Sequence, residues 1–184
     1  MKALSKNLKL LTVELAENWS PTNTGGYYTI LSNPGPTNAV YQTQRAALEE
    51  IVNAMIGICD EVANGKITEP LLQQDAALEE SPFAKSSIPD FTNNIKGVEN
   101  VYLGKYVADG KGIEDIVRKY NLSLDNTIKQ KQAAANAALA NVTKPLGEAI
   151  FSQKVQVQNA IDAINDLKTT LEDELLPLVQ QHSN

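Results

Sequence analysis

Apolar residues recur at helical spacing along most of the chain. The first stripe, with spacings of four, three and four residues, consists of Leu4, Leu8, Leu11 and Leu15. This spacing places the four leucines on one face of a helix. The helix is predicted to end near Trp19, because Pro21 disfavours a helical conformation of the residue before it.

Residues 22–38 interrupt the helical pattern. They are rich in Gly, Pro, Asn and Thr and include Gly25-Gly26 and Pro34-Gly35-Pro36. We interpret them as a long N-terminal loop within one domain rather than as a linker between domains.

A second stripe covers residues 44–64 and consists of Leu48, Ile51, Val52, Met55, Cys59 and Val62. Its helix is predicted to end at Asn64-Gly65, a common helix terminator. Cys59 lies on the stripe, so we expect a core thiol rather than a reactive one. Residues 67–86 are polar and contain Pro70 and Pro82, which predicts an irregular connection.

A third helix is predicted to begin at Ser87. Ser87 suits the N-cap, Pro89 suits the first turn, and Asp90 takes the capping-box position. The inward face of this helix is predicted to carry Ile88, Phe91, Ile95, Val98 and Tyr102.

Further helices are predicted over residues 112–120 and from a cap at Ser123 to about Val142. The last helix covers residues 146–179 and would be about 50 Å long at about 1.5 Å per residue. Its heptad stripe consists of Ile150, Val157, Ile164, Leu171 and Leu178. Lys154 and Lys168 interrupt the second seam position, which favours a bundle helix over a coiled-coil dimer.

No segment alternates apolar and polar residues over enough positions to predict a sheet. The expected fold is therefore all-α: an up-down helical bundle with a long C-terminal helix and a long N-terminal Gly/Pro-rich loop. We expect residues 1–184 to form a single helical-bundle domain, because this length suits one hydrophobic core.

The charge narrows the possible partners. The net charge of −6 argues against binding to nucleic acid, which requires clustered Lys and Arg. We expect no transmembrane segment, because no apolar run is long enough to span a bilayer. We expect no targeting signal in the first residues, since Lys6, Lys9 and Glu14 interrupt the apolar run that a signal peptide needs.

Familiar catalytic and metal-binding motifs are missing from the sequence. The single histidine, His182, has Val179 three residues before it, so the Glu-x-x-His motif of di-iron bundles is absent. We expect His182 to be a solvated residue of a frayed tail. Residues 104–111 depart from the spacing of a phosphate-binding loop, which leaves a turn between helices. Pairs of acidic residues such as Glu79-Glu80 are expected on solvated faces, because neighbouring side chains of a helix diverge.

One polar segment, residues 79–104, stands out. Around the predicted helix start it gathers Glu80, Ser81, Ser87, Asp90 and Asn94. Short polar side chains and free backbone N–H groups at a helix start suit a ligand or a protein surface. Helix capping alone would also explain Ser87 and Asp90, so both interpretations stay open here.

The same segment resembles the C-terminal half of imelysin-like proteins. In that family a Glu-Ser pair and an aromatic residue precede Ser, Asp-Phe, Asn-Ile and Asn-x-Tyr, as in residues 80–104. Residues 33–41, residues 60–70 and the long last helix also resemble Bacteroidetes members. The resemblance covers nearly the whole chain.

This resemblance implies an all-α protein of two helical bundles with a ligand site between them. It also implies export across the inner membrane, often as a lipoprotein in the periplasm or anchored to the outer membrane, and a role in iron uptake. The family's Gly-x-His-x-x-Glu motif belongs to the N-terminal half and is absent here. The chain is thus expected to be a non-catalytic second half whose partner is the N-terminal half. Its side of the ligand site would consist of Glu80, Ser81, Ser87, Asp90 and Asn94. The implied ligand is iron or an iron-containing compound, and no cofactor is expected within this chain.

Two alternatives stay open. A free-standing helical interaction module would use the loop of residues 22–38 and the acidic surface to dock another protein. A metallopeptidase would need its metal-binding motif from another segment.

Overall fold

The computed structural model describes residues 2–183, and their contacts divide them into two compact units. One contains residues 2–50 and 182–183, and the other contains Ile51–Gln181. The division falls within the helix α3 (Gln44–Asp60). A single domain over residues 1–184 stays a prediction.

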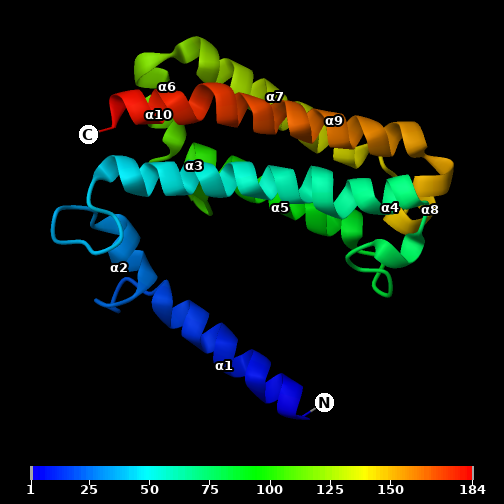
Figure 1. Ribbon diagram of the computed structural model, residues 1–184, viewed down its shortest axis with the longest axis horizontal. Helices are drawn as coiled ribbons and strands as arrows, with labels where there is room; N and C mark the ends of the chain where they lie inside the picture. Colours follow the sequence, from blue (N-terminus) through cyan, green and yellow to red (C-terminus); the bar gives the residue numbers. More distant parts are fainter. Residues whose placement is uncertain (1, 184) are drawn as a thin grey trace. The chain divides into compact units, whose positions relative to one another are not determined.

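The unit Ile51–Gln181 is an up-down helical bundle (Figure 1). The chain runs in one direction through α3 and its continuation, returns along α5, runs forward along α7 and returns along α9. Here α9 packs against α7 and against the continuation of α3. The helices after α3 are η1 (Glu61–Ile67), α4 (Thr68–Gln73), η2 (Ala76–Leu78), α5 (Ser87–Leu103), α6 (Ile113–Tyr120), α7 (Leu122–Ala140), α8 (Leu146–Ser152), α9 (Lys154–Thr170), η3 (Leu171–Leu175) and α10 (Leu176–His182).

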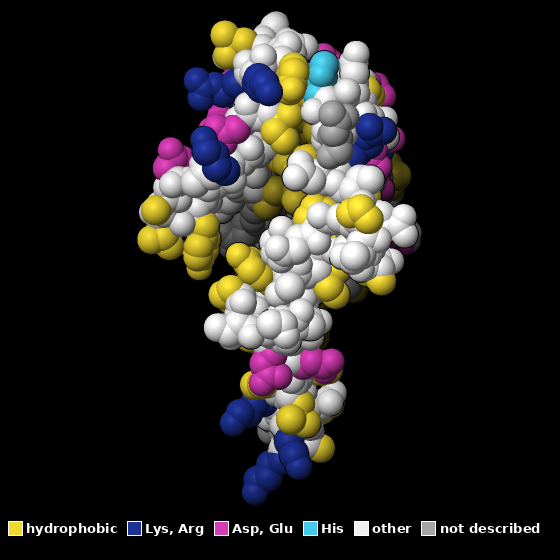
Figure 2. All heavy atoms as spheres, turned by 90° about the vertical axis from the view of Figure 1, so that its left-hand side faces the viewer, with side chains coloured by type: hydrophobic (Ala, Val, Ile, Leu, Met, Phe, Trp, Pro, Cys, Tyr) yellow, Lys and Arg dark blue, Asp and Glu magenta, His cyan; other side chains and the backbone are white. Residues whose placement is uncertain are grey.

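Helical apolar spacing explains this bundle. All five heptad residues of the last helical stretch are buried, because residues seven apart return to the same face. The stripes of α3, α5 and α7 also face inward, whereas the stripe of residues 4–15 is exposed (Figure 2); the fully buried side chains include Val52, Phe91, Ile95, Ile128, Leu139, Ile164 and Leu167. The all-α bundle expected from the sequence is confirmed.

The prediction that a helix ends at Asn64-Gly65 is wrong. The helix continues through the π-helical segment η1 into α4 and ends at Gln74, which has a left-handed φ of 51°. Asn64 stays helical because its side-chain nitrogen donates to Oδ1 of Asp60 at 2.8 Å and to Oδ1 of Asn165 at 3.0 Å. The apolar stripe through Val62 and Ile67 thus outweighs the local terminator.

Two further boundaries differ from the prediction. Asn121, not Ser123, caps α7, because its side-chain oxygen accepts from the backbone N–H of Leu124 at 3.0 Å. The last helical stretch is broken at Gln153, whose side-chain oxygen accepts from the backbone N–H of Lys144 at 3.0 Å.

A tight hairpin joins α5 to α6. Its strands are β1 (Lys105–Tyr106) and β2 (Ala108–Asp109), with Tyr106 opposite Ala108. Gly104 has a φ of +64°, and a Cβ on it would lie 2.3 Å from the carbonyl carbon of Lys111. Glycine is required there because both the conformation and the close approach exclude a side chain.

The other unit contains α1 (Lys2–Asn18) and α2 (Tyr27–Ser32). The predicted long loop therefore includes a short helix. Trp19 packs edge-on against Tyr27 with ring centroids 5.2 Å apart. The Tyr27 hydroxyl lies 2.8 Å from that of the buried Tyr41. Aromatic and hydroxyl contacts thus hold the region after α1 together.

The prediction of a frayed tail is wrong for the residues described. Helix α10 continues to His182, and Ser183 is buried. The Arg45 guanidinium donates through Nε to the backbone oxygen of Ser183 at 2.9 Å. Across residues 2–183, no helix is both long and apolar enough to cross a bilayer.

The Cys59 thiol should be unreactive in the native protein. It is fully buried, and burial raises its pKa to about 12. At about pH 8, near the ordinary thiol pKa of about 8.5, we expect a thiol reagent to label the denatured chain quickly and the native chain slowly. Mass spectrometry of the time course measures the difference, and equal rates would contradict the core position.

Asp60 should make stability depend on acid pH. Hydrogen bonds from Asn64 and then Lys168 lower the pKa of Asp60, and Lys168 Nζ lies 2.9 Å from its Oδ1. A lowered folded-state pKa stabilises the fold above the unfolded value of about 4, and this contribution is lost as the pH falls through the folded value.

We expect Asp60→Asn to cost up to about 1 kcal/mol near neutral pH, since the pair is partly screened by solvent. Urea unfolding from about pH 6 to about pH 2 measures the effect. The two proteins should converge in stability at the acid end; a constant difference would show that the carboxylate charge is not the cause.

Candidate functional site

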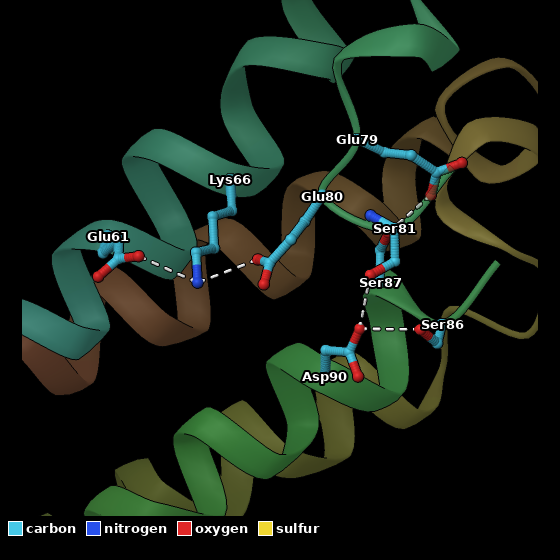
Figure 3. A network of polar contacts seen from close by, with 8 residues as sticks. All are labelled: Glu61, Lys66, Glu79, Glu80, Ser81, Ser86, Ser87 and Asp90. Carbon is cyan, nitrogen blue, oxygen red and sulfur yellow. Dashed lines mark hydrogen bonds and ion pairs between the residues drawn. The ribbon is translucent and has the colours of Figure 1, made fainter. Parts of the chain in front are cut away.

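A network of acids and hydroxyl groups surrounds the start of α5 (Figure 3). Its centre is the Ser87 hydroxyl, which is fully buried. Ser87 donates to Oε2 of Glu79 at 2.7 Å and accepts from the backbone N–H of Ser81 at 3.1 Å. Glu79 is only 7% exposed, so this hydrogen bond satisfies a carboxylate that folding removes from water.

Two local features bring Glu79 to Ser87. Asp75 caps the short helix η2 by accepting from the backbone N–H of Ala77 at 2.9 Å, which fixes the chain just before Glu79. At Gly147 a Cβ would lie 2.7 Å from Oε1 of Glu79, so glycine leaves room for the carboxylate beside α8.

A second carboxylate, Asp90, lies one turn into α5. Its Oδ2 accepts from the hydroxyl groups of Ser81 and Ser86, both at 2.9 Å. The predicted N-cap role of Ser87 is therefore wrong. Ser86 occupies the cap position without capping through its side chain, and Ser87 is the first helical residue. The two serines instead direct their hydroxyl groups to carboxylates.

Glu80 points away from this network toward η1 (Figure 3). Lys66 Nζ lies 3.0 Å from a carboxylate oxygen of Glu80 and 3.0 Å from one of Glu61. Burial acts to lower the pKa of Lys66, but the hydrogen bonds to Glu80 and Glu61 outweigh it and raise the pKa. The amine therefore stays charged and holds Glu80 in place.

The structure thus connects three of the five predicted site residues, Ser81, Ser87 and Asp90. Glu80 is adjacent in the chain but is held by Lys66. Asn94 is half-buried on α5, four residues after Asp90 and therefore on the same helical face. No hydrogen bond joins its side chain to the network among the residues described.

Sequence reasoning missed Glu79 and Lys66. The solvated face expected for Glu79-Glu80 holds for Glu80, which is exposed, and is wrong for the buried Glu79. The two side chains diverge because they lie in an extended segment, where neighbouring residues point to opposite sides. No local pattern identified Lys66, whose partner Glu80 is distant in sequence.

The donor set is rich in oxygen, and none of the network residues is a histidine or cysteine. Carboxylate and hydroxyl oxygens suit hard cations and polar ligands. Within residues 2–183, no three His, Cys, Asp or Glu side chains are grouped closely enough to hold a metal ion. Any ion held here would therefore need further ligands from elsewhere.

A second buried polar cluster joins α5, α6 and α7. The Tyr102 hydroxyl donates to Oδ1 of the buried Asp125 at 2.9 Å, and Lys129 Nζ lies 2.9 Å from Oδ2. Lys129 also pairs with Glu114 on α6. Burial and the bond to Asp125 raise the pKa of Tyr102, so its proton stays on the phenol. Each group has a partner, and the cluster holds α6 against the bundle.

Taken together, these features define an all-α bundle protein with an acid and hydroxyl network at one helix start. The sequence profile of the imelysin family (Peptidase_M75, Imelysin) matches residues 1–173. The chain belongs to the imelysin family.

A curated relative supports this membership. Iron-regulated protein A of Synechococcus elongatus is 33% identical over 159 residues, which cover 84% of this chain and 44% of that protein. The chain spans less than half the length of this relative.

Two solved structures share the fold. An imelysin peptidase from Bacteroides ovatus matches with a TM-score of 0.76 and 24% identity, over 90% of this chain and 50% of its own. A protein described as an iron-regulated protein A precursor, from Parabacteroides distasonis, matches with a TM-score of 0.78 and 21% identity, over 92% of this chain and 52% of its own. Both confirm the helical bundle, and in each the match covers about half of the longer solved chain.

Ser87→Ala should destabilise the bundle. It removes the hydroxyl group that satisfies the buried Glu79 carboxylate, which should cost about 1–3 kcal/mol. Ser123→Ala is the matched control, because Ser123 is exposed on α7 and the same atoms are removed. Urea unfolding compares the two. If both variants lose equally little stability, the hydrogen bond to Glu79 does not determine the start of α5.

Proposed function

We propose that this chain is the non-catalytic half of an imelysin-like extracytoplasmic protein with a role in iron uptake. It would form one side of a ligand site between two helical bundles. Membership in the imelysin family supports this proposal, together with the relative that is named as iron-regulated. The proposed location is the periplasm or the outer membrane, with the lipid anchor that the family resemblance implies.

The observation that carries the proposal is the fixed position of two carboxylates at the start of α5. Two serine hydroxyl groups orient Asp90 through one oxygen, Oδ2. Its Oδ1 takes no part in those two bonds. Lys66 orients Glu80 in the same way through Oε2. Preoriented oxygens lower the entropic cost of binding a ligand.

The five predicted residues divide into two roles under this proposal. Glu80, Asp90 and Asn94 are exposed or half-buried and would contact the ligand. Ser81 and Ser87 would act as positioning residues, because their hydroxyl groups are bonded to Asp90 and Glu79. Asp90 and Asn94 share a face of α5, so they would act together.

The second bundle would complete the site. The carboxylates of this chain do not converge in threes on one point within residues 2–183, so ligands from another segment are needed for an iron ion. An iron-containing compound would instead be held by hydrogen bonds and charge. In either case the partner is the N-terminal half of an imelysin-like protein, in the same chain or a separate one.

Substitutions on this side should weaken ligand binding. In a full-length chimera, this chain replaces the matching segment of Synechococcus elongatus iron-regulated protein A, and calorimetry follows binding of ferric citrate. We expect Glu80→Gln and Asn94→Ala each to weaken binding about tenfold, which corresponds to about 1.4 kcal/mol.

The control is Glu174→Gln, which makes the same change of charge at an exposed position on η3. Circular dichroism and thermal unfolding show whether each variant keeps its fold. Equal affinities for the original chimera, both site variants and the control would refute the assignment of this surface.

A further inference from the structure

A pocket of about 310 Å³ lies between η2, the loop after it and the start of α8. A volume in this range suits a small molecule. Small and apolar residues form most of its wall: Ala76, Ala77, Pro82, Pro145 and Gly147. All of them belong to the unit Ile51–Gln181, so the pocket does not depend on the placement of the N-terminal unit.

The buried carboxylate of Glu79 lines this pocket with one oxygen that has no donor. Its Oε2 accepts from Ser87 at 2.7 Å. Within residues 2–183, its Oε1 accepts no hydrogen bond, and no Lys or Arg forms an ion pair with it. Figure 3 shows this oxygen directed away from Ser87. It faces the Gly147 wall of the pocket, where a Cβ would lie 2.7 Å from it.

An oxygen of this kind requires a donor from outside the chain. Glu79 is only 7% exposed, so folding removes most of the water that would otherwise surround its carboxylate. A carboxylate oxygen without a hydrogen bond in such a position costs free energy. A pocket occupant that donates to Oε1 recovers this cost, which gives the pocket a preference for donors.

The nearest cation at the pocket, Lys85, is engaged elsewhere. Its Nζ lies 3.4 Å from Oε1 of Glu148, and both side chains are exposed at the rim. The backbone of Lys85 has a left-handed φ of 54°, uncommon for a residue with a side chain. Its N–H donates to the carbonyl of Ser81 at 2.8 Å, which fixes the turn that carries it. Lys85 and Glu148 therefore form a charged rim above an acidic base.

The donor set of the pocket selects among possible ligands. Glu79 and Glu148 repel anions. A metal ion needs several protein ligands, and the part of the chain that the structure describes groups no three His, Cys, Asp or Glu side chains closely enough. A guanidinium group binds best to both oxygens of a carboxylate, and Oε2 of Glu79 already accepts from Ser87. A primary ammonium group is a compact cation with three N–H donors and needs only the one free oxygen.

We propose that this pocket binds a small primary amine in its ammonium form. The ammonium group donates to Oε1 of Glu79, and the alkyl part contacts the walls formed by Ala77 and Pro145. The site is separate from the proposed iron-ligand surface, because Glu80, Asp90 and Asn94 do not line the pocket.

A titration of the 184-residue chain with propylammonium chloride tests the proposal. At about pH 7 this amine is protonated, as a lysine side chain is. Nuclear magnetic resonance of the 15N-labelled protein follows the backbone amides of Ala77 and Gly147 at constant ionic strength. We expect saturable shifts with a dissociation constant of a few mM, since one small group is recognised. Propanol lacks the charge and tetramethylammonium lacks the N–H donors, so both should bind at least about tenfold more weakly.

Glu79→Gln should weaken propylammonium binding at least about tenfold, which corresponds to about 1.4 kcal/mol. Glutamine keeps an oxygen that accepts from Ser87 and removes the charge. The matched control is Glu174→Gln, the same substitution at an exposed position on η3, which should bind as the unaltered chain does. Thermal unfolding shows whether each variant keeps its fold, and the comparison of the three probes on the unaltered chain needs no variant.

Four results would overturn the proposal. They are the absence of saturable shifts at Ala77 and Gly147, equal binding of propanol, equal binding by the Glu79→Gln variant, and binding that appears only after Lys85→Met. The last result would show that Lys85 itself occupies the site in solution. No iron is present in this titration, so its failure would leave the ferric citrate experiment unaffected.

Discussion

A carboxylate that folding removes from water needs hydrogen-bond donors, and Glu79 imposes this requirement on the region that enters α5. The donor is Ser87, whose backbone already belongs to the helix. Because Ser87 also accepts from the backbone of Ser81, the same hydroxyl group determines the path of the chain from η2 into α5. That path places Glu80 beside Lys66 and Ser81 beside Asp90. The geometry of the candidate site therefore depends on one buried hydrogen bond and on the absence of a side chain at Gly147.

The fold of this chain was largely predictable because its strongest signal is repeated. Each long helix of Ile51–Gln181 carries an apolar stripe at helical spacing, and the five heptad residues from Ile150 to Leu178 are all buried. Sequence signals for the ends of helices were less informative, because side-chain packing competes with them. Asn64-Gly65 terminates many helices, yet here the stripe continues and the helix passes through a π-helical segment. Glutamine is not a residue that typically ends a helix. The side chain of Gln153 nevertheless forms hydrogen bonds with the loop before α8, and the last helix is broken there.

The candidate site was predictable only in part, for a different physical reason. The clustering of Ser81, Ser87 and Asp90 around a helix start is local in sequence, so composition and capping rules located it. Their partners were not predictable in the same way. Glu79 is exposed or buried depending on the turn that precedes it, and Lys66 on η1 pairs with Glu80 in the extended segment before α5. The same limit applies to Asp125, whose two donors come from different helices and whose burial no sequence period reveals.

Exposed apolar side chains distinguish α1 from the helices of the bundle. In Ile51–Gln181, apolar stripes are buried and the buried carboxylates of Glu79 and Asp125 have hydrogen-bond donors. In α1 the leucine spacing is as regular, yet no residue is buried. The same helical periodicity thus produces a core in one place and an exposed surface in the other. Since apolar area in water is unfavourable at roughly 25 cal/mol per Å², the leucines of such a helix contribute to stability only when another apolar surface covers them. The leucine spacing of α1 therefore determines its helix but not its packing, whereas the stripes of the bundle determine both.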